Sequence, residues 1–202
     1  MAWWCRELLH HSLTRDPDKV RDLLLSLDVI RRYTKSIHKP CVTFNRVFEN
    51  SLGRRNWVNI TAHDRGCYSN VGRNPNGHNI LNLNINDGCF NYIGHAMHEM
   101  MHTLGIYHEH SRPDRDKYVQ VHYLNIIPEY RHNFNKYNDS FVTTFDYPYD
   151  YNSVMHYPTN AFAKRRLYKT LEPIPNAQRP IGQRSILTVY DIYKIRNAYN
   201  CV

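Results

Sequence analysis

The stretch that decides the fold and the chemistry of this chain runs from His98 to His108 and reads His-Glu-Met-Met-His-Thr-Leu-Gly-Ile-Tyr-His. On an α-helix His98 and His102 lie one turn apart, so both imidazoles project from one face and can bind one metal ion. Glu99 lies beside them on the same turn. This spacing predicts a helix that carries a metal site.

The residues that follow the helix complete the predicted site. Gly105 allows the chain to leave the helix in a left-handed conformation, and His108 then turns back toward the first two histidines. Three neutral imidazoles leave one position on a zinc ion open for water, which indicates a catalytic site. His95 lies one turn before His98 and is a competing ligand. Its use would leave His108 out of the site, so we expect it to lie on the surface or around the ligands.

Two further stretches narrow the class of protein. Residues 109–116 (Glu-His-Ser-Arg-Pro-Asp-Arg-Asp) and 153–157 (Ser-Val-Met-His-Tyr) accompany the spacing H-E-x-x-H-x-x-G-x-x-H. Together they resemble the astacin family of the metzincins, in which the second stretch forms a Met-turn with a tyrosine. The resemblance covers about Asp16 to Cys201.

The resemblance implies an α+β fold with two lobes split by an active-site cleft. The N-terminal lobe would hold a mixed sheet and two long helices, and the C-terminal lobe would be largely irregular with a final helix. Residues 1–15 stay unassigned. The catalytic domain is expected over 16–202, with lobes of about 16–107 and 108–202.

The resemblance also implies a role for each residue of the site. Zinc would be bound by His98, His102 and His108, and Glu99 would take a proton from the metal-bound water. Tyr157 would be an extra ligand in the free enzyme and would then hydrogen-bond the tetrahedral oxyanion. The alternative for Tyr157 is a buried phenol that donates to a backbone carbonyl.

Structural support is expected from Gly105, Glu109 and Met155, the last as an apolar floor beneath the ligands. The implied function is a zinc-dependent endopeptidase that acts on protein substrates. The alternative is a catalytically silent zinc-binding or matrix-associated protein, or an N-terminally incomplete protease. It arises because three family features cannot be identified before the long helix: a propeptide, a first strand and a mature amino terminus buried near the glutamate that matches Glu109. Glu109 is therefore expected to lack its usual partner, the amino terminus.

Composition bounds the class of protein. The chain has 202 residues, which is long enough for one well-buried domain. Its formal net charge is +8. Its basic runs, Arg54-Arg55 and Lys164-Arg165-Arg166, come with no motif that reads DNA or RNA, so we expect no nucleic-acid partner. No apolar run approaches the ~20 residues of a membrane span, and the first residues do not resemble a signal peptide. An acidic substrate preference is a further hypothesis, with the charge supplied by Arg165, Arg166, Arg179 or Arg184.

Five cysteines allow at most two internal disulfides. The resemblance implies the pairs Cys41–Cys201 and Cys67–Cys89, which leaves Cys5 over. Such bridges persist in oxidising compartments, so we expect a secreted, extracellular protein. N-glycosylation sequons begin at Asn59 and Asn138 and agree with export.

The remaining elements follow from local patterns. Asp16 as N-cap and Pro17 predict a helix that ends before Pro40. Its expected core face consists of Val20, Leu23, Leu24, Leu27, Ile30, Tyr33 and Ile37. Strands are predicted at 41–44, 57–60, 67–71 and 81–86, and helices at 90–104, near 124–137 and after Thr188, which forms a capping box with Asp191. By the resemblance, strand 81–86 is a sheet edge that could pair with an extended substrate.

Overall fold

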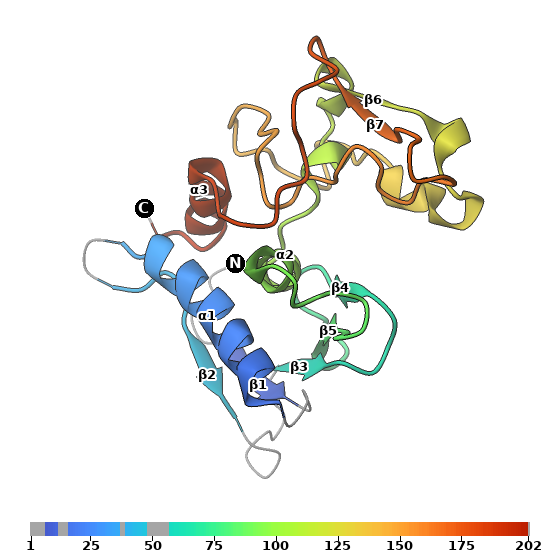
Figure 1. The fold of residues 1–202 in the computed structure, drawn as a ribbon. Coiled ribbons are helices and arrows are strands. Elements are labelled where there is room, and N and C mark those ends of the chain that lie inside the picture. The colour runs from blue at the N-terminus through green and yellow to red at the C-terminus, as the bar shows by residue number, and fades with distance from the viewer. Residues whose placement is uncertain (1–6, 12–15, 37–38, 48–56, 202) are drawn as a thin grey trace. The chain divides into compact units, whose positions relative to one another are not determined.

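The computed structural model describes residues 7–11, 16–36, 39–47 and 57–201 (Figure 1). The chain forms two compact units, Met1–Ile106 with Arg184–Val202, and Tyr107–Gln183. In order, the elements are β1 (Glu7–His11), α1 (Pro17–Tyr33), β2 (Phe44–Arg46), β3 (Val58–Thr61), β4 (Cys67–Ser69), β5 (Asn79–Leu83), α2 (Ile93–Thr103), the 3₁₀ helices η2 (Glu109–Ser111) and η3 (Arg115–Lys117), β6 (Val119–Val121), the 3₁₀ helices η4 (Tyr123–Asn125) and η5 (Pro128–Phe134), β7 (Leu171–Pro173) and α3 (Val189–Ala198).

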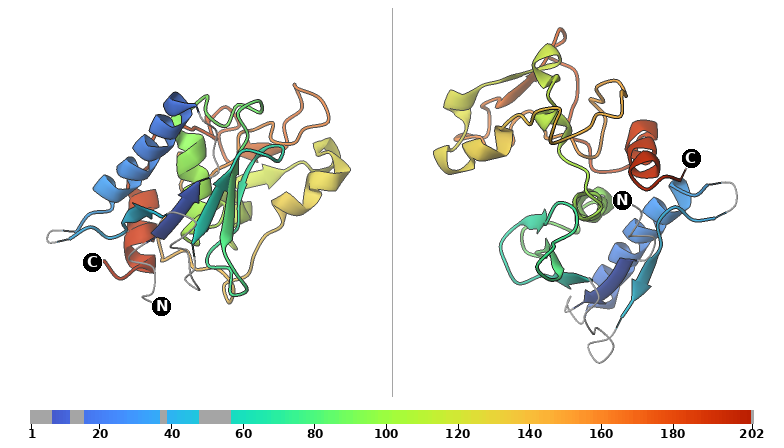
Figure 2. Two further views of the ribbon diagram at one scale, coloured as in Figure 1. Left: turned by 90° about the horizontal axis from the view of Figure 1, so that it is seen from below. Right: turned by 180° about the vertical axis from the view of Figure 1, so that it is seen from behind.

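The first unit is built on a five-stranded mixed sheet in the order β2-β1-β3-β5-β4. Strands β1, β2, β3 and β5 run parallel, and β4 is antiparallel to β5. Helices α1 and α2 contact each other, and α2 packs on β4 and β5 (Figures 1 and 2). Sheet residues Val58, Ile60, Leu81 and Leu83 are buried. The predicted α+β class with a mixed sheet is confirmed.

The structure corrects the expectation that no first strand precedes the long helix. Strand β1 lies between β2 and β3, with Leu9 aligned to Arg46 on one side and to Val58 on the other. The segment Glu-Leu-Leu-His-His has neither an alternating pattern nor β-branched residues. Its strand conformation therefore depends on backbone pairing with both neighbours, which overrides its weak local preference.

Strand β5 is not the sheet edge that the sequence suggested. It spans Asn79–Leu83, between β3 and β4, so β4 is the edge on that side of the sheet. Its asparagines do not all face water, because Asn82 is buried and its side-chain amide donates to the carbonyls of Asp64 and Gly66 at 2.8 and 2.9 Å. Asn82 therefore binds the neighbouring loop, since buried amides form hydrogen bonds with nearby carbonyls.

Helix α1 begins as predicted, with the Asp16 carboxylate accepting from the N–H groups of Asp18 and Lys19. It ends earlier than predicted, at Tyr33, where the Thr34 hydroxyl donates to the Ile30 carbonyl at 2.8 Å. The predicted core positions Leu23, Leu27 and Ile30 are buried, whereas Leu24 and Tyr33 are 52% and 63% exposed. Ile37 lies outside the described residues.

The C-terminal helix α3 belongs to the first unit, whereas the sequence placed residues 108–202 in one lobe. The predicted capping box of Thr188 and Asp191 is present at its start. Three links explain the grouping: the Cys41–Cys201 disulfide, a hydrogen bond of 3.3 Å from the Tyr199 hydroxyl to the Leu104 carbonyl, and a bond of 3.0 Å from Gly94 N–H to the Arg184 carbonyl.

The second unit contains little regular structure. Strands β6 and β7 pair antiparallel, and the helix predicted near 124–137 is a pair of 3₁₀ helices, η4 and η5. Pro128 starts η5. Short 3₁₀ helices of this kind commonly connect other elements. The buried core consists of Val119, Ile126, Phe134, Tyr149, Tyr151 and Leu171. In the described residues of both units no helix has the length and apolar character to cross a membrane.

The two disulfides, Cys41–Cys201 and Cys67–Cys89, are the pairs that the resemblance implied, and their sequence separations are 160 and 22. In the chain-entropy model these loops correspond to stabilisation of about 5 and about 3 kcal/mol. We predict that replacing Cys41 and Cys201 by alanine lowers the free energy of unfolding more than replacing Cys67 and Cys89. Urea titrations of both double variants measure the difference, and the reverse ranking would contradict loop closure as the main effect.

Candidate metal centre

Helix α2 lies in the interior of the first unit and holds two of the predicted ligands rigidly. His98 and His102 are 4% and 6% exposed, and their rings meet edge-on with centroids 4.7 Å apart. The same helix contains Ala96, Met97 and Met100, which favour helix formation and are buried. The predicted one-turn spacing therefore places both imidazoles together.

Gly105 supplies the left-handed turn that ends the helix. Its φ is +94°, a conformation that side chains resist, and its N–H donates to the His102 carbonyl at 2.8 Å. The same carbonyl accepts from Gly72 N–H at 2.8 Å. The ligand-bearing end of α2 is thus fixed both by the turn and by the neighbouring loop.

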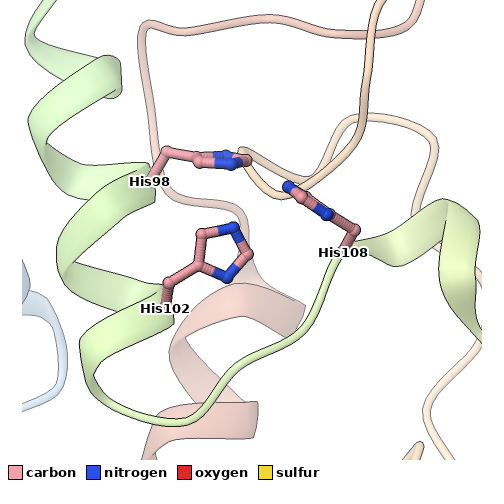
Figure 3. A group of neighbouring side chains, drawn as sticks. All are labelled: His98, His102 and His108. Atoms are coloured by element: carbon pink, nitrogen blue, oxygen red, sulfur yellow. The ribbon is translucent and has the colours of Figure 1, made fainter. Parts of the chain in front are cut away.

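His108 completes a group of three. The ligand nitrogens of His98, His102 and His108 lie within 4.8 Å of one another, and Figure 3 shows the three rings turned toward a shared centre. Three nitrogen donors that leave a fourth position open are the ligand set of a catalytic zinc site.

The protonation state of His102 fits a metal ligand. Its Nδ1 lies 2.8 Å from the Ile106 carbonyl oxygen, which only accepts, so Nδ1 carries the proton and Nε2 presents its lone pair. Burial lowers the pKa of His102 to about 4, and the positive charge of Arg184 adds to this shift. The imidazole is therefore neutral at physiological pH, as metal binding requires.

Glu99 follows His98 on the same turn and is 6% exposed. Burial raises the pKa of its carboxyl to about 8, while the Arg184 guanidinium acts in the opposite direction. A carboxyl with a pKa near neutrality can both accept and release a proton under physiological conditions. The structure thus places a carboxyl with a raised pKa next to the candidate zinc ligands.

Tyr157 lies among histidine rings in the second unit. Its ring centroid is 4.4 Å from that of His108 and 4.1 Å from that of His110, the latter in a stacked arrangement. The Tyr157 carbonyl lies 2.7 Å from Nδ1 of His156, whose Nε2 lies 2.8 Å from the Tyr149 hydroxyl. Sequence reasoning assigned no function to His110 or His156, although both belong to its two motifs.

Glu109 is not left without a partner. Its carboxylate accepts from the Arg112 guanidinium at 3.1 Å and from the Asp150 N–H at 2.9 Å. Its own N–H donates to the carbonyl of fully buried Met155 at 3.1 Å. Glu109 therefore joins the segment after His108 to the turn that carries Met155.

His95 is not a member of the metal-binding group found among the described residues. Its ring contacts Tyr92 edge-on at 5.9 Å, and burial lowers its pKa. A position around the ligands, as expected from the sequence, is compatible with both observations.

An α+β domain with three converging histidines and a neighbouring glutamate defines a candidate zinc metallopeptidase. The family model described as Astacin, a peptidase family, matches residues 19–200. The chain belongs to the astacin family. One zinc ion is the catalytic metal of this family, and the three histidines form its candidate site here.

Related proteins agree with the family. High choriolytic enzyme 1 of Oryzias latipes is 44% identical over 163 residues, which cover 81% of this chain and 56% of that protein. Meprin A subunit alpha of Rattus norvegicus is 41% identical over 164 residues, 81% of this chain and 21% of that protein. A solved structure of the Oryzias enzyme, described as a hatching enzyme zinc-protease, has a TM-score of 0.85 at 33% identity and covers 98% of this chain and 91% of that one. The chain thus spans 56% and 21% of the lengths of these two curated relatives.

We predict that replacing His98, His102 or His108 by alanine abolishes retention of one zinc ion per chain, because two imidazoles alone bind zinc weakly. Elemental analysis of the purified protein after dialysis measures the ratio. His95→Ala is the matched control on the same helix and should retain zinc. A His95 variant that loses the metal while His108→Ala keeps it would reverse the ligand assignment.

Proposed function

We propose that this protein is a zinc-dependent endopeptidase that hydrolyses peptide bonds of protein substrates. The observation that carries the proposal is the group of three histidines with Glu99 on the same helical turn. Membership of a peptidase family supports it. Zinc, when bound, lowers the pKa of a coordinated water and polarises the scissile carbonyl.

Glu99 is proposed as the general acid and base. It would take a proton from the attacking water and deliver it to the leaving amine, with its pKa already raised toward neutrality by burial. The role of Arg184 would be electrostatic, because its charge limits this rise and favours the carboxylate form. A non-catalytic scaffold has no need of an ionisable group that is so deeply buried.

Tyr157 is proposed to donate its phenolic proton to the oxyanion and to be an extra metal ligand in the free enzyme. The stacked His110 and the neighbouring His108 both contact its ring and restrict it. Oxyanion donors act through such pre-arrangement, because no reorganisation is then needed during the reaction. Gly105, Glu109 and Met155 would hold the segments that carry these groups.

An extracellular location is part of the proposal. Two disulfides support it, because such bonds persist outside the reducing cytosol. A preference for acidic substrates is a finer hypothesis. The sequence suggested four arginines for binding an acidic substrate residue. Of these, Arg179 stacks over Tyr151 at 4.0 Å. Arg184 acts electrostatically on Glu99 and His102, so Arg184 is the better candidate for this role.

We predict that Glu99→Gln retains zinc but lowers the rate of peptide cleavage by about 10²–10⁴-fold, because the amide cannot accept a proton. Cleavage of a quenched fluorescent peptide, with and without a chelator, measures the effect. Glu129→Gln, an exposed substitution of the same kind, is the control and should leave the rate unchanged. A zinc-loaded wild type without activity would favour the silent scaffold instead.

We predict that Tyr157→Phe lowers kcat by about 10²–10³-fold with little change in KM, because the phenolic bond forms only in the transition state. Steady-state kinetics separate the two constants. Tyr130→Phe, which removes the hydroxyl of an exposed tyrosine, is the matched control. An unchanged kcat would leave Tyr157 as a structural phenol.

A further inference from the structure

The chain carries two N-glycosylation sequons, Asn59-Ile60-Thr61 and Asn138-Asp139-Ser140. The sequence alone does not distinguish them, because both satisfy the same three-residue rule. An attached glycan is bulky and hydrated, so the folded protein accepts it only at an exposed backbone segment. The structural surroundings of the two asparagines therefore decide which one carries a glycan.

Asn59 lies in the interior of the sheet. It is the second residue of β3 and aligns with His10 of β1 on one side and with Ile80 of β5 on the other. Its side-chain oxygen is buried. The hydroxyl of Thr61 is also engaged, since it donates to the side chain of Asn82 at 2.8 Å in a buried position. A glycan on Asn59 would therefore have to be attached in the middle of a central strand, beside a side-chain oxygen that is already buried.

Asn138 lies in an exposed turn of the second unit. All three residues of its sequon are exposed. The Asn138 carbonyl accepts from the N–H groups of Phe141 and Val142, both at 3.1 Å, which closes the turn. The Ser140 hydroxyl donates to the Asn138 side-chain oxygen at 2.7 Å, so the two functional groups of the sequon already lie together.

The turn is held at a defined place on the surface. The Tyr137 N–H donates to the Ser111 carbonyl at 2.9 Å. The Tyr137 ring contacts Tyr107 and Phe141, with centroids 4.8 and 5.2 Å apart. Phe141 is itself 60% exposed. The turn therefore presents Asn138 outward with room for a large substituent and without displacing packed side chains.

We propose that Asn138 is an N-glycan attachment site and that Asn59 is not. The donor would be a polyprenyl pyrophosphate-linked oligosaccharide. A bond forms between Nδ2 of Asn138 and the anomeric carbon, and the bond from that carbon to the pyrophosphate oxygen breaks. The polyprenyl pyrophosphate leaves, and the proton lost by the amide balances the negative charge that it carries away. The proposal rests on the export proposed above and is independent of peptidase activity.

The test is expression of the full chain behind a cleavable secretion leader in eukaryotic cells. The secreted protein should show one discrete mass decrease on treatment with an N-glycosidase, and peptide mapping should find Asn138 converted to aspartate and Asn59 unmodified. Asn138→Gln and Ser140→Ala should each remove the decrease and keep any peptidase activity. Asn135→Gln is the matched control, because Asn135 is exposed nearby but begins no sequon, and it should keep the decrease.

Two results would overturn the proposal. One is a secreted protein whose mass does not change with the glycosidase. The other is a glycan that persists in Asn138→Gln or maps to Asn59. Peptide mapping of the wild type covers the second result without an Asn59 variant, which would disturb the sheet.

Discussion

The structure depends on bringing three imidazoles close together, two of them on a buried helix and the third on the segment that follows it. Burial lowers the pKa of His102 and so keeps this ligand neutral, and the hydrogen bond from its Nδ1–H to the Ile106 carbonyl orients the ring. The same burial acts on Glu99, where a rise in pKa to about 8 corresponds to roughly 5 kcal/mol against the charged form. Because this cost comes from the buried surroundings of α2, the packing of the rest of the first unit must offset it.

Those surroundings explain the architecture of the first unit. The sheet contacts α2 along β4 and β5, α1 lies beside it, and α3 is linked to its end through the Tyr199–Leu104 bond. The Cys41–Cys201 disulfide ties the last residues to the segment before β2. The elements around α2 thus come from both ends of the chain, which ties the stability of the site to long-range contacts.

Features that depend on local spacing could be predicted from the sequence. The histidine spacing, the N-cap at Asp16 and the capping box at Thr188 each follow from helical geometry within a few residues, and all are present. Strand β1 could not be predicted, because its conformation depends on pairing with two distant strands. The position of β5 within the sheet was wrong for the same reason. Side-chain partners were also beyond local patterns: the stacking of His110 on Tyr157 joins two motifs that are far apart in sequence, and neither motif specifies which rings meet.

The charged residues that follow His108 hold neighbouring segments together through buried hydrogen bonds. Arg115 is 4% exposed, and its Nη1 donates to the carbonyls of His110 and Phe134 at 2.9 and 2.8 Å. Arg112, which is also buried, connects the carboxylates of Glu109 and Asp114. A planar guanidinium can bridge separated acceptors in fixed directions, which a lysine ammonium cannot do in the same geometry. The charges after His108 therefore order the second unit around Tyr157 and its histidine neighbours, and catalysis would benefit indirectly, through the precision with which that ring is held.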